Sequence, residues 1–113
     1  MTIIGAHTII FSTKPEEDRA LLRDVLQLPF VDAGDGWLIF GLPPAELAVH
    51  PHQRNNVHMF YLMCDDIEKF ILEMGRHGIA CDEVLTVEWG KLTYISLPGG
   101  GKLGVYQPLH ERP

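Results

Sequence analysis

Residues 56–61, Asn-Val-His-Met-Phe-Tyr, repeat the pattern of residues 5–10, Gly-Ala-His-Thr-Ile-Ile, in which a histidine precedes large apolar or β-branched side chains. A second pair of stretches matches further along the chain. Residues 46–50, Glu-Leu-Ala-Val-His, and residues 102–106, Lys-Leu-Gly-Val-Tyr, both alternate aliphatic side chains with polar or small ones. This alternation is typical of strands with one face against a core. The sequence therefore contains an internal repeat of roughly 55 residues.

Each half of the repeat contains one helical segment among short strands. Helices are predicted over about residues 15–27 and 66–77, and the second begins with a capping box of Asp65 and Glu68. Glycine and proline turns separate the predicted strands, which lie near residues 5–12, 30–33, 37–41, 46–50, 57–64, 82–87, 91–97 and 102–107. The order is strand, helix and three strands, given twice.

Length and composition are those of a single globular domain. The chain has 113 residues, of which 46% are hydrophobic and 21% are charged. We predict one α+β domain over residues 1–113, with module one at about residues 3–51 and module two at about residues 56–109. Two such βαβββ modules side by side would form a curved mixed sheet round a cleft.

The alternation of side chains every two residues predicts which face of the sheet each side chain lies on. Odd-numbered residues of the two matching strands, Leu47, Val49, Leu103 and Val105, are predicted to face the helices. The even-numbered residues would then face the cleft. The predicted cleft residues are His7, Phe11, Ala48, His50, His58, Phe60, Gly104 and Tyr106, and Tyr94 adds a further aromatic ring.

Charge and hydropathy argue against two classes of partner. The net charge is -6 and the cationic side chains are scattered, so neither nucleic acid nor an anionic membrane surface is an expected partner. The longest apolar runs are of strand length, and no secretory signal is visible, so we expect a cytoplasmic protein.

Cys64 and Cys81 lack the spacing of a metal or redox motif and are predicted to be buried, inert thiols.

The paired modules, each opened by a histidine, resemble the vicinal oxygen chelate superfamily, which includes glyoxalases, extradiol dioxygenases, fosfomycin-resistance transferases and bleomycin-binding proteins. The resemblance covers nearly the whole chain. Residues 23–29, Arg-Asp-Val-Leu-Gln-Leu-Pro, are similar to a helix-to-strand signature of that superfamily, with Gln27 at a position that is usually glycine. Residues 104–108, Gly-Val-Tyr-Gln-Pro, are similar to its usual ending. The resemblance implies a glyoxalase-like fold and a homodimer.

The same resemblance bears on metal binding. Metal-dependent members of the superfamily coordinate an ion with a histidine on the first strand of each module and a glutamate or histidine on each fourth strand. His7 and His58 match the first positions, whereas the other two fall on Ala48 and Gly104, whose side chains have no ligand atom. The resemblance thus implies that the standard four-ligand site is absent.

Three interpretations of the cleft stay open. In the first, a metal-free, glyoxalase-like or bleomycin-resistance-like protein binds or transforms a small apolar or aromatic molecule, with His7 and His58 as polar or catalytic groups. In the second, His7, His58 and either His50 or Glu46 hold Fe, Mn, Ni or Zn in a lyase, isomerase or dioxygenase. In the third, the histidines are structural, as we also expect of His110 in a mobile tail.

Overall fold

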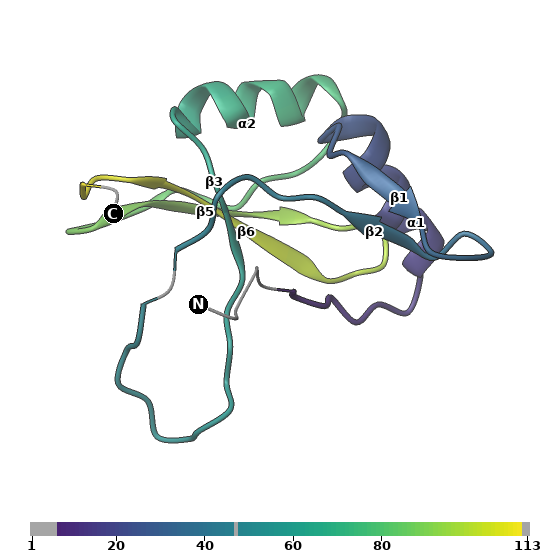
Figure 1. Ribbon diagram of the computed structural model, residues 1–113. Helices are drawn as coiled ribbons and strands as arrows, with labels where there is room; N and C mark the ends of the chain where they lie inside the picture. Colours follow the sequence, from purple (N-terminus) through teal and green to yellow (C-terminus); the bar gives the residue numbers. More distant parts are fainter. Residues whose placement is uncertain (1–6, 47, 112–113) are drawn as a thin grey trace.

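The chain is described by a computed structural model over residues 7–46 and 48–111, and the predicted α+β class is confirmed. The elements, in chain order, are α1 (Pro15–Ala20), the π-helical η1 (Leu21–Val25), β1 (Phe30–Asp32), β2 (Leu38–Phe40), β3 (Tyr61–Met63), α2 (Ile67–Arg76), β4 (Leu85–Val87), β5 (Gly90–Ser96) and β6 (Lys102–Pro108). Strands β1 and β2 form an antiparallel hairpin. The other four form a mixed sheet in the order β3-β6-β5-β4, in which β3 and β6 are parallel. Helix α2 lies over one face of this sheet (Figure 1).

The second half of the chain has the predicted order of strand, helix and three strands. Strand β6 lies between β3 and β5, so hydrogen bonds satisfy both of its edges. Leu103 and Val105 of β6 are 2% and 1% exposed, as their predicted core positions require. Leu103 packs in one cluster with residues of η1, α2, β5 and the turn after β5, namely Leu21, Met74, Ile95 and Leu97. This cluster fixes the helices to one face of the sheet.

The helix boundaries differ in detail from those predicted. The first helix ends with a π turn in which the Leu26 N–H donates to the Leu21 carbonyl at 3.1 Å, followed by Gln27 at φ +55°. A left-handed residue stops a helix, so this one ends before the predicted residue 27. Helix α2 is capped by Asp66, whose carboxylate accepts from the Lys69 N–H at 3.1 Å. The predicted cap at Asp65 is therefore wrong by one residue.

Two predicted strands of the first module do not form in the described part of the chain. Residues 7–12 and 48–50 have no strand pairing, while residues 5 and 6 and Leu47 lie outside the described residues. Val49, predicted to be in the core, is 90% exposed, and Phe11, predicted in the cleft, is 91% exposed. The physical reason is that alternation of apolar and polar residues gives a segment two different faces but does not supply a neighbouring strand. Because a single strand without hydrogen bonds to a neighbour is not stable, the alternation alone does not produce one.

The segment between β2 and β3 leaves the body of the molecule. We call residues 41–46 and 48–60 the arm; it extends downward in Figure 1, and no strand is assigned within it. It leads directly into β3, which lies at the edge of the four-stranded sheet. Among the described residues, no helix is long and apolar enough to cross a bilayer.

Candidate functional site

A cavity of about 900 Å³ lies where the arm meets β3 and β6. Its lining includes Pro43, His58 and Phe60 from the arm, and Val105 and Tyr106 from β6. Most of the other lining side chains are aliphatic or aromatic. A concave, largely apolar space of this size matches the pockets that enclose small organic ligands.

Aromatic rings from distant parts of the chain meet along one wall. The Tyr106 ring lies edge-to-face with Trp89 at 5.5 Å and with Tyr61 at 5.8 Å, measured between centroids. His50 of the arm makes a similar contact with Trp89 at 6.0 Å. Such pairs present both ring faces and ring edges to a bound molecule. The wall can therefore stack against a planar ligand.

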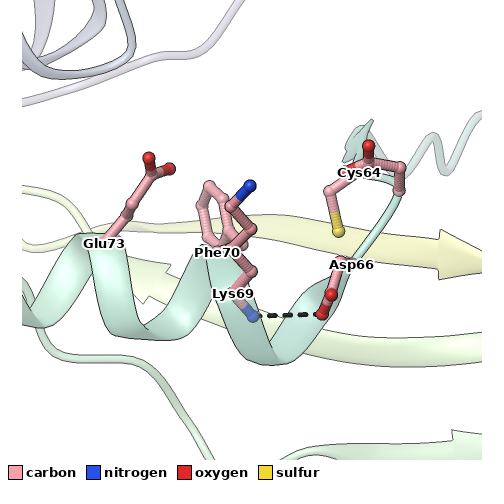
Figure 2. A pocket seen from close by; sticks show the side chains of 6 residues that line it. Cys64, Asp66, Lys69, Phe70 and Glu73 are labelled. Atoms are coloured by element: carbon pink, nitrogen blue, oxygen red, sulfur yellow. Dashed lines mark hydrogen bonds between the residues drawn. The ribbon is translucent and has the colours of Figure 1, made fainter.

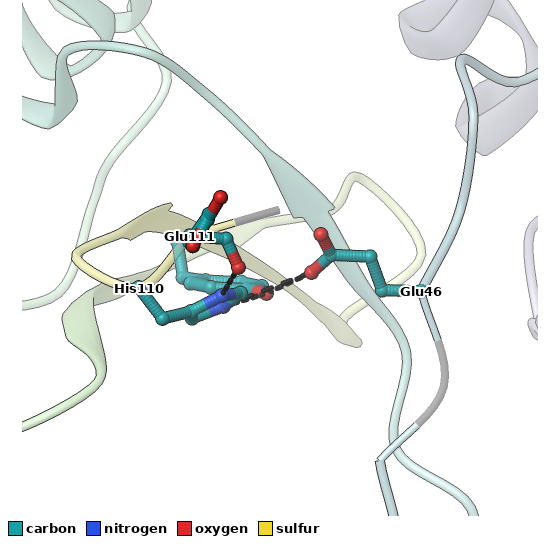
Figure 3. A network of polar contacts seen from close by, with 4 residues as sticks. Glu46, His110 and Glu111 are labelled. Atoms are coloured by element: carbon teal, nitrogen blue, oxygen red, sulfur yellow. Dashed lines mark hydrogen bonds and ion pairs between the residues drawn. The ribbon is translucent and has the colours of Figure 1, made fainter. Parts of the chain in front are cut away.

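One end of the cavity is polar (Figure 3). The Tyr106 hydroxyl donates to the Glu46 carboxylate at 3.1 Å and lies 3.4 Å from Nε2 of His110, which is 3.7 Å from the same carboxylate. Nδ1 of His110 donates to the backbone carbonyl of Glu111 at 2.9 Å. Because Nδ1 holds this proton, Nε2 is an acceptor when the ring is neutral and a donor when it is charged.

Sequence reasoning placed His110 in a mobile tail and so missed this network. Glu46 and Tyr106 are 60 positions apart in the chain, and His110, which follows β6, lies close to both. The sequence feature that could have indicated this network was the position of His110, four residues after Tyr106, which was predicted to face the cleft. No periodic pattern linked either residue to Glu46.

The cavity takes in some of the predicted cleft residues and leaves out others. Ala48, His50, His58, Phe60 and Tyr106 line it, together with Glu46. The lining does not include His7, Phe11, Tyr94 or Gly104. His7 and Phe11 are exposed in the unpaired segment that precedes α1. The structure thus joins His58, but not His7, to the other predicted groups.

Gly104 does not open space for a ligand as predicted, because two tyrosines cover it. A Cβ atom there would lie 3.2 Å from the Tyr94 ring and in closer contact with the Tyr61 ring. The hydroxyls of the two tyrosines are 2.9 Å apart. Burial, followed by this hydrogen bond, raises the pKa of Tyr61 to about 12, so the phenol stays protonated at neutral pH.

The residues of the alternative metal site are not gathered into one. No three His, Cys, Asp or Glu side chains within residues 7–46 and 48–111 are placed together to hold an ion. His7, His58, His50 and Glu46 all belong to these ranges.

A second, smaller pocket of about 190 Å³ adjoins the cavity at the start of α2, and the two share Cys64 and Phe70 (Figure 2). Asp66, Lys69 and Glu73 also line it. Burial raises the pKa of the Cys64 thiol to about 11. Since the thiolate is the reactive form, Cys64 is a poor nucleophile here.

Comparison with known proteins gives matches in structure only. No family model and no curated protein matches the chain. TnmS3, an antibiotic binding protein from Streptomyces sp. CB03234, is 18% identical with a TM-score of 0.70, and the match covers 96% of this chain and 98% of that one. Lactoylglutathione lyase from Agrobacterium tumefaciens is 17% identical with a TM-score of 0.64, covering 95% and 94%. The fosfomycin resistance protein FosX from Mesorhizobium loti is 15% identical with a TM-score of 0.54, covering 95% and 93%. At these identities the likeness is one of fold.

Proposed function

We propose that this chain, which has the fold of the vicinal oxygen chelate superfamily, binds a small apolar or aromatic molecule in the cavity beside the arm. The observation that carries the proposal is the wall of Trp89, Tyr106 and Tyr61, which borders about 900 Å³ of mostly apolar space. Burial of an apolar ring against such a wall drives binding through the hydrophobic effect. The antibiotic-binding role of the similar TnmS3 structure supports binding as the primary activity.

The ligand is held, in this proposal, by side chains of the protein without a metal ion. The two positions that the superfamily resemblance assigns to carboxylate or histidine ligands are Ala48 and Gly104, and neither side chain can coordinate an ion. Elemental analysis of protein purified without a His tag or added metal tests this. Near-stoichiometric Fe, Mn, Ni or Zn would overturn the metal-free proposal.

The two tryptophans provide an internal test of where a ligand binds. Trp89 lines the cavity, whereas Trp37 is exposed and lies under the guanidinium of Arg19. In a ¹H–¹⁵N NMR titration with 2-naphthylmethanol, the indole N–H signal of Trp89 should shift and that of Trp37 should stay. Trp89→Phe and Trp37→Phe variants assign the two signals. No shift, or equal shifts of both signals, would contradict binding in the cavity.

We also propose that the chain is a homodimer. The apolar side chains of Phe11 and Val49 are almost fully exposed, and β3 has one sheet edge that no described strand covers. A second copy that paired with this edge would satisfy its open backbone groups, and a dimer interface that also covered these two side chains would remove apolar surface that a monomer leaves open to aggregation. Light scattering coupled to size exclusion should give a dimer mass for the wild-type chain and a monomer mass for Val49→Lys. A monomer mass for the wild type would refute this proposal.

A further inference from the structure

We infer that His50 determines the ligand specificity of the cavity, which selects an aromatic molecule whose hydroxyl group forms a hydrogen bond with the His50 imidazole. The inference rests on the proposed function and narrows its ligand class. It follows from the position of His50 on the aromatic wall, from the hydrogen-bonding capacity of its ring nitrogens and from the partners that other polar groups of the lining already have.

His50 lies against the wall that would stack with a ligand. Its ring meets the ring of Trp89 at an interplanar angle of 81°, with centroids 6.0 Å apart, and Trp89 in turn meets Tyr106 at 5.5 Å. His50 also belongs to the cavity lining itself. A planar molecule stacked on Trp89 or Tyr106 would therefore lie close to the imidazole.

The ring nitrogens of His50 are available to such a molecule. Within residues 7–46 and 48–111, neither nitrogen has a hydrogen-bond or ion-pair partner. A neutral imidazole has one donor and one acceptor nitrogen, and the tautomer decides which of them faces the cavity. A hydroxyl group can donate to the one or accept from the other, whereas an ether or a ketone can only accept. A ligand hydroxyl therefore suits His50 in either tautomer.

Several other polar side chains of the lining already have hydrogen-bond partners within the chain. They form the pairs Tyr106–Glu46, His110–Glu111, Tyr61–Tyr94 and His52–Arg54. A ligand hydroxyl at one of these groups would compete with a bond that the protein makes itself. His58 also lines the cavity without such a partner in the described part of the chain, but it makes no ring contact there with the wall. These comparisons favour His50.

A purely structural role for His50, packing against Trp89, predicts a different result on mutation. His50→Phe keeps a ring at this contact and removes both nitrogens. Packing would survive in this variant, whereas selection of a hydroxyl group would not. His7→Phe is the matched control, because His7 is exposed and lies outside the cavity lining.

Two probes that differ at one group isolate the hydrogen bond: 2-naphthylmethanol, and 2-ethylnaphthalene, which has a methyl group in place of the hydroxyl. The measured quantity is the association constant of the alcohol divided by that of the hydrocarbon, from NMR titrations that follow the Trp89 indole signal. Comparing this ratio between variants cancels the greater hydrophobicity of the hydrocarbon. We expect the ratio to fall by about tenfold in His50→Phe, since only the alcohol loses a bond there.

Two further variants complete the experiment. His50→Leu also lacks the nitrogens, so its ratio should fall to the same value, and it takes the place of His50→Phe if that variant does not fold. His7→Phe should keep the wild-type ratio. His58→Phe tests the other imidazole of the lining that has no partner among the described residues.

The outcomes distinguish this inference from the proposed function. An unchanged ratio in His50→Phe would overturn the role of His50 and leave the apolar binding site standing. A fall in His7→Phe, or a fall in His58→Phe without one in His50→Phe, would also overturn it. If both His50 variants fold and the ratio falls in only one, the effect comes from ring packing and the inference is wrong. Failure of both probes to bind the wild-type chain would overturn both proposals.

Discussion

The hydroxyl oxygens of Tyr61 and Tyr94 lie 2.9 Å apart, and their rings meet over Gly104 on the strand between them. The register explains the contact, since Gly104 pairs with Tyr61 on one side and with Tyr94 on the other. Side chains of paired residues project from the same face of a sheet. The glycine leaves room for both rings to lean together, with centroids 6.0 Å apart.

Gly104→Ala is expected to lower the free energy of unfolding by about 1 to 3 kcal/mol, because the added methyl group must displace the Tyr61 ring. Urea unfolding followed by circular dichroism measures the loss. Gly101→Ala serves as the control, since a Cβ atom at that turn position would meet no atom within 4 Å. Equal stability of Gly104→Ala and the wild type would mean that the rings do not close over the glycine.

Val105 and Val49 should respond differently to truncation, although the alternation assigns both to the core. Val105→Ala should cost about 1 to 3 kcal/mol of unfolding free energy, because the side chain is 1% exposed and its loss leaves a void. Val49→Ala should cost less than about 0.5 kcal/mol in the monomeric chain, because Val49 is exposed. Chemical denaturation at low protein concentration measures both, and similar losses would place Val49 in the core after all.

Asp18 of α1 anchors the turn between β5 and β6. Its carboxylate is buried and accepts from the Gly99 N–H at 2.7 Å. Asp18→Ala leaves that N–H without its acceptor and should cost about 1 to 3 kcal/mol of unfolding free energy. Glu17→Ala, one position earlier on the exposed side of α1, should change the unfolding free energy little. Thermal melts of the two variants compare them directly, and matched melting temperatures would rule out the anchor.

Gln27 occupies a left-handed conformation, φ +55°, that glycine adopts more easily. Gln27→Gly is therefore expected to raise the free energy of unfolding by about 1 kcal/mol despite the greater freedom of glycine in the unfolded chain. Gln53→Gly in the arm provides the comparison and should bring no gain, because Gln53 is not at positive φ. A destabilised Gln27→Gly variant would show that contacts of the glutamine side chain outweigh the backbone strain.

Cys64 should be unreactive near neutral pH. Burial, and then the nearby carboxylates of Asp65, Asp66 and Glu68, raise the pKa of its thiol to about 11. At pH 8 alkylation by iodoacetamide should be about a hundredfold slower than for the same thiol in the denatured chain, as mass spectrometry can measure. The free energy of unfolding should fall as the pH rises from about 9 toward 11, since the unfolded chain gives up this proton first. Rapid alkylation of the native protein at pH 8 would contradict the burial of Cys64.

The sequence by itself predicted the second half of the fold well. The apolar stripe of α2 and the alternation of residues 102–106 each describe a local period, and local periods arise from the geometry of a helix or strand. Leu103 and Val105 were therefore placed on the correct face. The superfamily resemblance rested on the order of such elements along the chain. A single residue that differs from the superfamily pattern does not change that order.

Tertiary structure alone brought Trp89 and His110 together with Glu46 and Tyr106 at the cavity. Glu46, Trp89, Tyr106 and His110 come from the arm, the turn before β5, the strand β6 and the tail. Their contact depends on the path of the arm and on the position of β6 next to β3, and no local pattern encodes either. For the same reason the alternation at residues 46–50 marked two faces without determining whether a neighbouring strand would cover one of them. A strand acquires a buried face only through its partners, and those partners are chosen by packing over the whole chain.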